Sequence, residues 1–257
     1  FVVKIRERCF RFADVITVTT KKTYEDFEAI YGDQFQDKLK VCRFATAGIA
    51  CIHDIAACKT AEDCKKELGI PAEKICITCG YSAYEDQHQD VILQKIGSLP
   101  DDTKKNLFVV VPMQYGRYNQ PYIDRVHNEA EKCGCQVRIL EDYYPFEKNA
   151  ALSLATDIYI HMRDTDAFSN SLKEQIYAGS KTIIGSWLKY YELEEMKAPV
   201  VWAHSFDELP GILRQLISDI SVGENQLFTP IYSLYSPEHV KEEWDSVIRI
   251  CVKSVER

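Results

Sequence analysis

Length, composition and charge exclude several classes of protein before any motif is considered. The chain has 257 residues, 46% of them apolar, and a formal net charge of −8. This is enough apolar material for one sizeable core of roughly 150–200 residues with appendages. No apolar run approaches the ~18 residues of a membrane span. A net negative chain without runs of Lys or Arg also argues against nucleic-acid binding.

The ten cysteines follow no metal-binding or disulfide pattern. Cys76 and Cys79 form a Cys-x-x-Cys pair, but they fall in a predicted strand, where alternation points their side chains to opposite faces. Cys133-Gly134-Cys135 lacks the further ligands of a tetrahedral zinc site. We therefore expect no bound metal. Many unpatterned cysteines in an acidic chain also indicate a reducing, cytoplasmic compartment.

From about Ala13 onward, short β-branched runs alternate with longer amphipathic stretches. The predicted strands are, in chain order, Val15–Thr19, Leu39–Arg43, Lys74–Cys79, Leu107–Pro112, Gln136–Leu140, Asp157–Met162, Lys181–Gly185 and Val200–Ala203. The predicted helices between them are Lys21–Tyr31, Ala61–Leu68, Gln87–Gly97, Gln120–Cys133, Pro145–Leu154, Ser169–Ala178, Leu188–Glu195 and Asp207–Ser218. Repeated βα units indicate an α/β fold, a Rossmann-like parallel sheet with helices on both faces.

The last predicted helix has the clearest start, with Ser236 at the N-cap and Pro237 at the first helical position. Residues 221–236 before it are the least structured, and a weaker seam lies near residues 45–54. We therefore divide the chain into a βα unit over 1–45, a main domain over 46–235 and a C-terminal helix over 236–257. Because the chain opens on Phe1 without a signal-peptide pattern, we interpret it as a piece of a longer protein.

The strongest local feature is the segment from Arg163 to Glu174, which follows a predicted strand. Asp166 lies at the carboxyl end of that strand, where open α/β sheets bind ligands. Glu174 would face the same cleft and could accept hydrogen bonds from sugar hydroxyls. Alternatively, Asp166 only caps a helix together with Ser169, and Glu174 is solvated.

The helix that begins within this segment is a candidate anion site. Small residues at its start, Ser169 and Ser171, leave backbone N–H groups open, so a diphosphate could dock on the helix N-terminus. Phe168 directly precedes Ser169, and we expect its side chain to contact the same bound ligand. We therefore expect these three residues to contact the bound molecule.

A second loop, after the predicted strand Lys74–Cys79, has the small residues that a close backbone approach requires. Gly80 permits a tight turn, and Ser82 leaves space for a phosphate or substrate. His88 could donate to a phosphate oxygen, although a lone His at this position is more often an ordinary polar residue. Two glycines of the dinucleotide fingerprint are absent from the loop.

Two further strand ends carry weaker signals. Tyr115, Gly116 and Arg117 follow the strand Leu107–Pro112, and a guanidinium can fork onto two phosphate oxygens. Arg117 is equally well explained as an exposed loop residue. Tyr143 follows the next strand and could contact a nucleobase.

Together these loops occupy four consecutive strand ends, which share one edge in a doubly wound sheet, so one cleft is expected. The arrangement resembles the C-terminal domain of GT-B glycosyltransferases. Their acidic pair, separated by seven residues, looks like Asp166 and Glu174, with Asp in place of the commoner first Glu. Gly179 looks like the small residue that ends their donor-site helix, and residues 13–31 look like their linker-side βα unit.

A more particular similarity, over residues 75–190, is to the bacterial TDP-N-acetylfucosamine:lipid II N-acetylfucosaminyltransferase family. The glutamines that this family has after the arginine are absent, and so is the lysine that many retaining GT-B members place on the diphosphate. Donor sugar and lipid acceptor are therefore not carried over. The matching residues are, in order, Gly80-x-Ser82-Ala83, His88, Val111-Pro112-Met113-x-Tyr115-Gly116, Tyr122-Ile123 and Arg163.

The resemblance implies the donor-binding half of a glycosyltransferase. Asp166 would hold sugar hydroxyls near the reacting carbon, and Glu174 the ribose or sugar. Arg163, Arg117 and the helix start at Ser169 would stabilise the leaving diphosphate. GT-B transferases generally use no bound metal, so we expect no cofactor beyond the nucleotide diphospho-sugar donor itself.

The same resemblance implies partners and a location. The unit over 1–45 would be the tail of a missing N-terminal domain that binds an acceptor glycan or lipid-linked sugar, in bacterial surface glycan synthesis. We expect an enzyme that lies in the cytoplasm or at the inner face of the membrane, with at most peripheral membrane contact. We expect the isolated piece to have no activity. The alternatives are a non-catalytic nucleotide-sugar-binding scaffold and a GT-B nucleotide-sugar epimerase.

Overall fold

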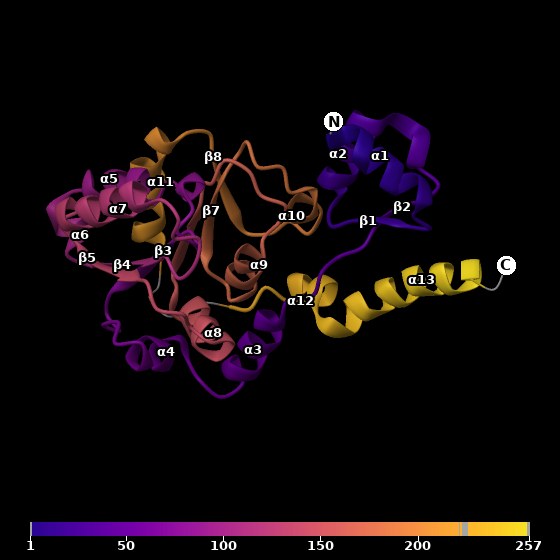
Figure 1. Ribbon diagram of the computed structural model, residues 1–257. Helices are drawn as coiled ribbons and strands as arrows, with labels where there is room; N and C mark the ends of the chain where they lie inside the picture. Colours follow the sequence, from indigo (N-terminus) through magenta and orange to yellow (C-terminus); the bar gives the residue numbers. More distant parts are fainter. Residues whose placement is uncertain (1, 221, 223–225, 256–257) are drawn as a thin grey trace.

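A six-stranded parallel sheet forms the centre of the main domain, as shown by a computed structural model that describes residues 2–220, 222 and 226–255 (Figure 1). The strand order is β5-β4-β3-β6-β7-β8, and every neighbouring pair is parallel. The strands are β3 (Ile75–Cys79), β4 (Leu107–Pro112), β5 (Gln136–Leu140), β6 (Ile158–His161), β7 (Lys181–Gly185) and β8 (Val200–Ala203). The predicted α/β class with a parallel sheet is confirmed.

The order in which the chain adds strands to this sheet changes direction at β3, and this switch point lies between the neighbouring strands β3 and β6. The chain builds outward from β3 through β4 to β5, and then returns to add β6, β7 and β8 on the other side of β3. The loops after β3 and β6 therefore diverge at neighbouring strand ends, and a crevice opens between them.

Helices cover both faces of the sheet, and each face has its own apolar core. Cys76 belongs to one core and Cys79 to the other, so the predicted alternation within β3 is confirmed. The first face is covered by α3 (Ala47–Ala56), α4 (Ala61–Glu67), α8 (Phe146–Ala155), α9 (Asn170–Tyr177) and α12 (Thr229–Tyr235). The second face is covered by α5 (Gln89–Gly97), α7 (Gln120–Lys132) and α11 (Leu209–Asp219). The remaining short elements are α6 (Asp101–Lys104), α10 (Tyr191–Glu195), η2 (Glu85–Gln87) and η3 (Phe206–Glu208).

Several segments without a predicted helix turn out to be helical, among them α3 and α12. The seam expected near residues 45–54 is the start of α3, whose Ile49 and Ile52 are fully buried against the sheet domain. The stretch 221–236, expected to be the least structured, contains α12 with Ile231 and Tyr235 buried; residues 221 and 223–225 lie outside the described part. Both helices are short and largely apolar, and their periodicity is therefore weak. Tertiary packing stabilises them.

A smaller unit precedes the main domain and has its own two-stranded parallel sheet. Its aromatic side chains form a separate cluster, in which Phe10 lies 5.2 Å from Phe27 and 5.7 Å from Phe35 between ring centroids. The elements are α1 (Val2–Phe12), β1 (Ile16–Val18), α2 (Lys21–Tyr31), η1 (Gly32–Phe35) and β2 (Leu39–Val41). The helix α2 packs against α10 of the main domain, where the Lys21 amide donates to Glu192 at 3.1 Å.

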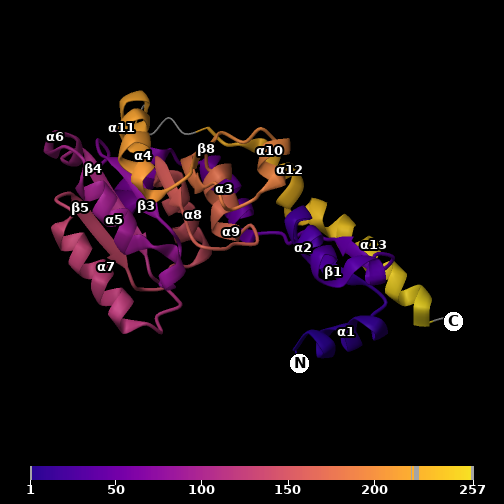
Figure 2. The ribbon, with the colours of Figure 1, turned by 90° about the horizontal axis from the view of Figure 1, so that it is seen from above.

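The C-terminal helix α13 (Pro237–Val255) extends from the main domain toward the side where the smaller unit lies (Figures 1 and 2). The helix α13 contacts the linker between the two sheets at Arg43 and Phe44. The Trp244 indole N–H donates to the Arg43 carbonyl at 2.9 Å, the Arg43 side chain pairs with Glu243, and Phe44 stacks on Trp244 at 5.7 Å. The predicted start of this helix at Pro237 is confirmed.

Lys173 of α9 is buried near this junction, with its ammonium 4.6 Å from the Tyr235 ring and 5.3 Å from the Phe168 ring. Burial lowers the pKa of Lys173 to about 8, against the opposing effect of nearby carboxylates. The folded state therefore holds the Lys173 proton less tightly than the unfolded chain does. Burial of the charged ammonium destabilises the folded state fully below about pH 8, and this cost is relieved as the pH rises and the ammonium loses its proton.

We therefore expect the melting temperature of the wild type, relative to Lys173→Met, to rise by about 5–10 °C between pH 7 and pH 10. Thermal unfolding at the two pH values measures the difference. Lys148→Met is the matched control, because Lys148 also lies over a tyrosine ring but is exposed. An equal change for both variants would show that Lys173 stays charged in the folded state.

Candidate functional site

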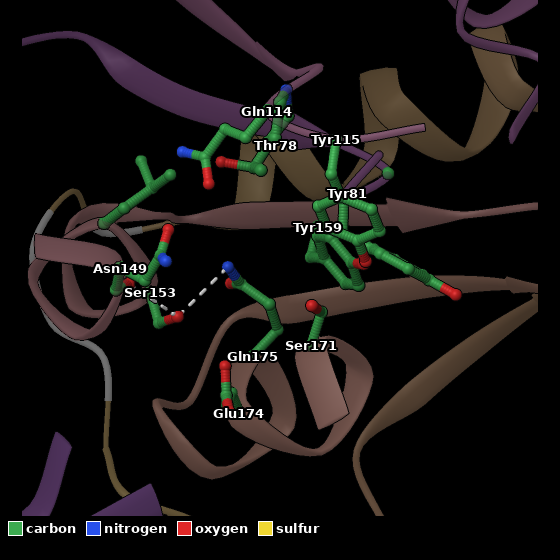
Figure 3. A pocket seen from close by; sticks show the side chains of 13 residues that line it. Thr78, Tyr81, Gln114, Tyr115, Asn149, Ser153, Tyr159, Ser171, Glu174 and Gln175 are labelled. Carbon is green, nitrogen blue, oxygen red and sulfur yellow. Dashed lines mark hydrogen bonds between the residues drawn. The ribbon is translucent and has the colours of Figure 1, made fainter. Parts of the chain in front are cut away.

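A cavity of about 90 Å³, open to solvent on one side, lies at the carboxyl ends of β3, β4 and β6, at the crevice expected from the strand order (Figure 3). Helices α8 and α9 close its other side. The lining residues are Thr78, Gly80, Tyr81, Pro112, Gln114, Tyr115, Asn149, Leu152, Ser153, Tyr159, Ser171, Glu174 and Gln175. We call it the switch-point cavity. Aromatic rings, amides and hydroxyls dominate the wall, which fits an uncharged, hydroxyl-rich group.

Two polar atoms on the wall of the switch-point cavity have no hydrogen-bond partner among the described residues. They are the Tyr159 hydroxyl and the Gln114 amide nitrogen. Tyr159 is 1% exposed, and burial raises the pKa of its phenol well above the usual value, so it stays protonated. A buried polar group without a partner costs about 1–3 kcal/mol, which favours a ligand or water that satisfies both atoms.

Glu174 reaches the switch-point cavity from α9 and is also tied to the start of α3. The Thr46 hydroxyl donates to its carboxylate, and a Cβ on Gly48 would lie 2.1 Å from Glu174 Oε1. Burial raises the pKa of Glu174, although the hydrogen bond from Thr46 opposes the shift. The alternative that Glu174 is a solvated surface residue is wrong, because the fold encloses it.

Asp166 is held by several neighbours at the end of β6. Its Oδ2 accepts from the Ser169 amide at 2.8 Å and from the Tyr190 hydroxyl at 2.8 Å, and lies 3.3 Å from His161 Nε2. Its Oδ1 lies 3.4 Å from Arg163. Burial opposes its ionisation, but the hydrogen bond and charge of His161 and the donors at Ser169 and Tyr190 keep the pKa of Asp166 below its usual range. Asp166 is therefore a fixed carboxylate beside the start of α9, where it accepts from the amide of the N-cap residue Ser169.

Asp166 lines a second cavity, of about 210 Å³ and open to solvent on one side, between the main domain and α2. Its wall includes the loop after β6, the loop after β7 and residues Thr20, Lys22, Thr23 and Asp26. We call it the inter-unit cavity. Asp166 and Glu174 were expected to face one cleft, but they line two neighbouring cavities. Tyr81 connects the two sites, because it lines the first cavity and its hydroxyl lies 3.4 Å from Asp166.

Each of the three predicted phosphate-binding cations has a carboxylate partner. Arg163 pairs with Asp86, His88 Nε2 lies 2.7 Å from Asp164, and Arg117 lies 2.9 Å from Glu141. His88 is also not within the helix as predicted; it precedes α5 with φ 51°. No cation is among the residues that line the switch-point cavity.

The other predicted residues divide between wall, support and surface. Gly80 (φ 65°), Tyr115 and Ser171 line the switch-point cavity. Ser82 is fully buried, and its hydroxyl has no partner among the described residues. Gly116 (φ 78°) supports the loop, since a Cβ there would lie 2.9 Å from the Tyr84 ring.

Three predicted contacts are placed differently from the expectation. Phe168 is 2% exposed and packs on Tyr190 at 5.1 Å, so it contributes mainly core, although it lines the inter-unit cavity. The Ser169 amide, expected to be open to an anion, already donates to Asp166. Tyr143 is 74% exposed and lines neither cavity.

Sequence reasoning missed several wall residues, among them Gln114, Asn149 and Tyr159. Gln114 follows a strand end within a loop that was considered, and Tyr159 is a tyrosine in a fully buried strand, which is a usable signal. Asn149 lies on α8, shortly after the loop that holds Tyr143, and no sequence signal distinguishes it from its neighbours on that helix.

Within residues 2–220, 222 and 226–255, no three or more His, Cys, Asp or Glu side chains cluster so that they could hold a metal ion. No helix in the same residues is long and apolar enough to cross a bilayer.

The parallel sheet, its strand order and the cavity at its switch point define a Rossmann-like half of a GT-B fold. Three similar structures illustrate this fold. Sucrose-phosphate synthase from Thermosynechococcus elongatus superposes with a TM-score of 0.76, at 11% identity over 98% of this chain and 61% of that chain. HepE of Anabaena, in complex with UDP and glucose, gives 0.71 at 14% identity, covering 93% and 64%.

A trehalose-phosphate synthase from Burkholderia vietnamiensis gives a TM-score of 0.67 at 11% identity, covering 98% of this chain and 65% of that chain. The chain thus spans less than two thirds of the length of these structures. No protein-family model and no curated protein sequence matches it. The similarity is therefore one of fold.

Proposed function

We propose that this chain is the donor-binding half of a GT-B glycosyltransferase and holds a nucleotide diphospho-sugar. The nucleoside would occupy the switch-point cavity, and the sugar would lie toward the inter-unit cavity beside Asp166. The observation that carries this proposal is the wall at the switch point, where Glu174 and the unpartnered Tyr159 and Gln114 offer hydrogen bonds to hydroxyl and carbonyl groups. The complex of the similar HepE structure with UDP and glucose supports it.

In the proposed reaction, the bond between the sugar's anomeric carbon and the diphosphate oxygen breaks, an acceptor hydroxyl oxygen bonds to that carbon, and the hydroxyl proton passes to the leaving diphosphate. Negative charge develops on the leaving diphosphate and needs stabilisation. Amide groups at the start of α9 and the guanidinium of Arg163 would supply it without a metal. The resemblance places the acceptor, a glycan or lipid-linked sugar, on a further domain, and the enzyme in the cytoplasm with at most peripheral membrane contact.

A non-catalytic nucleotide-sugar-binding scaffold is the second candidate, because one observation favours it. The predicted phosphate-binding cations Arg163, His88 and Arg117 are all paired with carboxylates of the chain itself. A scaffold would retain the cavity without stabilising a leaving group. Analysis of products from the chain joined to its acceptor-binding half separates transfer, epimerisation and binding alone.

Calorimetric titration with UDP, GDP, ADP and TDP tests the binding proposal. We expect one of them to bind, weakly, because the isolated chain supplies half of a closed cleft. A metal chelator is expected to leave both the affinity and the melting temperature unchanged. No heat with any of the four nucleotides, in a sample shown to be folded, would contradict the donor-binding proposal, and a drop in melting temperature with the chelator would contradict the metal-free one.

A further inference from the structure

Each of the three guanidinium nitrogens of Arg163 donates to a side chain of the protein. The guanidinium donates to Asp86 through Nε at 3.2 Å and through Nη2, and to the Tyr81 hydroxyl through Nη1. It also lies 5.4 Å from the centroid of the Tyr81 ring and 3.4 Å from Asp166. One positive charge is thus shared by two carboxylates, and an incoming anion has to compete with them for it.

Among the three ion pairs at this edge of the sheet, the pair of Arg163 with Asp86 is the most sheltered. The side chains of Arg163 and Asp86 are 16% and 26% exposed, whereas Asp164, the partner of His88, is 67% exposed. Solvent screens exposed pairs and makes them weak, so they exchange readily with phosphate. A sheltered pair competes with phosphate much more strongly.

The carboxylate of Asp86 is also incompletely satisfied. Its Oδ1 is buried without a hydrogen-bond partner among the described residues, while its Oδ2 takes both donors of Arg163. Its main chain is anchored separately, because the Asp164 amide donates to the Asp86 carbonyl at 3.1 Å. The side chain can therefore turn toward solvent while the loop stays in place.

We propose that Asp86 is an internal competitor of the donor diphosphate: it occupies Arg163 in the empty site, and the diphosphate must displace it to bind. This inference rests on the proposed function. It makes Asp86 a residue that sets the affinity for the phosphate part of the ligand. Recognition of the uncharged nucleoside in the switch-point cavity is independent of it.

The test compares Asp86→Asn with the wild type by calorimetric titration with UDP, uridine and inorganic pyrophosphate. Asparagine keeps the shape of the side chain but leaves Arg163 without its anionic partner. We expect UDP and pyrophosphate to bind about tenfold more tightly to the variant and uridine to bind equally. The same charge change at Asp207→Asn, which breaks an exposed pair with Lys95, should alter none of the three affinities.

The possible outcomes separate this inference from the proposed function. Unchanged or weaker UDP binding by a folded Asp86→Asn protein, when the wild type binds UDP, overturns the role of Asp86 and leaves the donor site standing. No binding of UDP, GDP, ADP or TDP by wild type or variant overturns the proposed function and this inference together. Asp86→Ser, which removes the charge with a smaller side chain, gives the same comparison if Asp86→Asn fails to fold.

Discussion

Replacement of Lys65 by methionine is expected to lower the free energy of unfolding by about 3–5 kcal/mol. Lys65 of α4 forms an ion pair with Asp157 at 2.6 Å, and both side chains are 1% exposed. The ammonium also donates to the Lys74 carbonyl at 3.0 Å, and Asp157 Oδ2 accepts from the Cys76 amide at 2.7 Å. Removing the lysine leaves a buried carboxylate without its countercharge, which is far more costly than the pair itself is stabilising.

Urea unfolding measures this loss in the free energy of unfolding, and two further variants test its cause. Lys66→Met changes an exposed neighbour on the same helix and should shift the free energy of unfolding by less than about 0.5 kcal/mol. The double replacement of Lys65 by Met and Asp157 by Leu removes both charges and should recover much of the loss. A loss below about 1 kcal/mol for Lys65→Met would show that water reaches the pair. Because Asp157 precedes β6, at the edge opposite the cavity, nucleotide affinity of the folded variant should not change.

Glu174→Gln is expected to weaken nucleotide binding roughly ten- to hundredfold. Glutamine preserves the shape of the side chain and removes a charged acceptor, and hydrogen bonds to charged groups contribute about 1.5–3 kcal/mol. The affinity is measured with whichever nucleoside diphosphate binds the wild type. Glu62→Gln, on the exposed side of α4, is the matched control and should leave the affinity unchanged.

The structure provides a specific rival explanation for Glu174. The carboxylate also accepts a hydrogen bond from Thr46 at the start of α3, so it could serve only to join α9 to α3. In that case Glu174→Gln would lower the melting temperature and leave the affinity as it is. Equal affinities for the folded variant and the wild type would therefore remove Glu174 from the ligand site and assign it to the fold.

The sequence by itself determined the sheet. Buried parallel strands are continuous β-branched and apolar runs, such as Leu107–Pro112, and their signal is local, so every predicted strand was found with ends that differ by no more than two residues. The meeting of the loops after β3, β4 and β6 at one edge followed as well, because parallel strands with helical crossovers all end at one edge, but the loop after β5 lines neither cavity. Short helices such as α3 and α12 were missed, since their stability comes from the surfaces that they cover.

Only the tertiary structure decided what the predicted site residues contact. Arg163 is 77 residues from Asp86, and Glu174 is 128 residues from Thr46. Such pairings depend on which loops become neighbours when β6 returns beside β3, and no local pattern encodes that return. The sequence could therefore place a cation and two carboxylates at the right edge of the sheet. Whether the cation is free for a ligand or held by a carboxylate is decided by distances between segments that meet only in the folded chain.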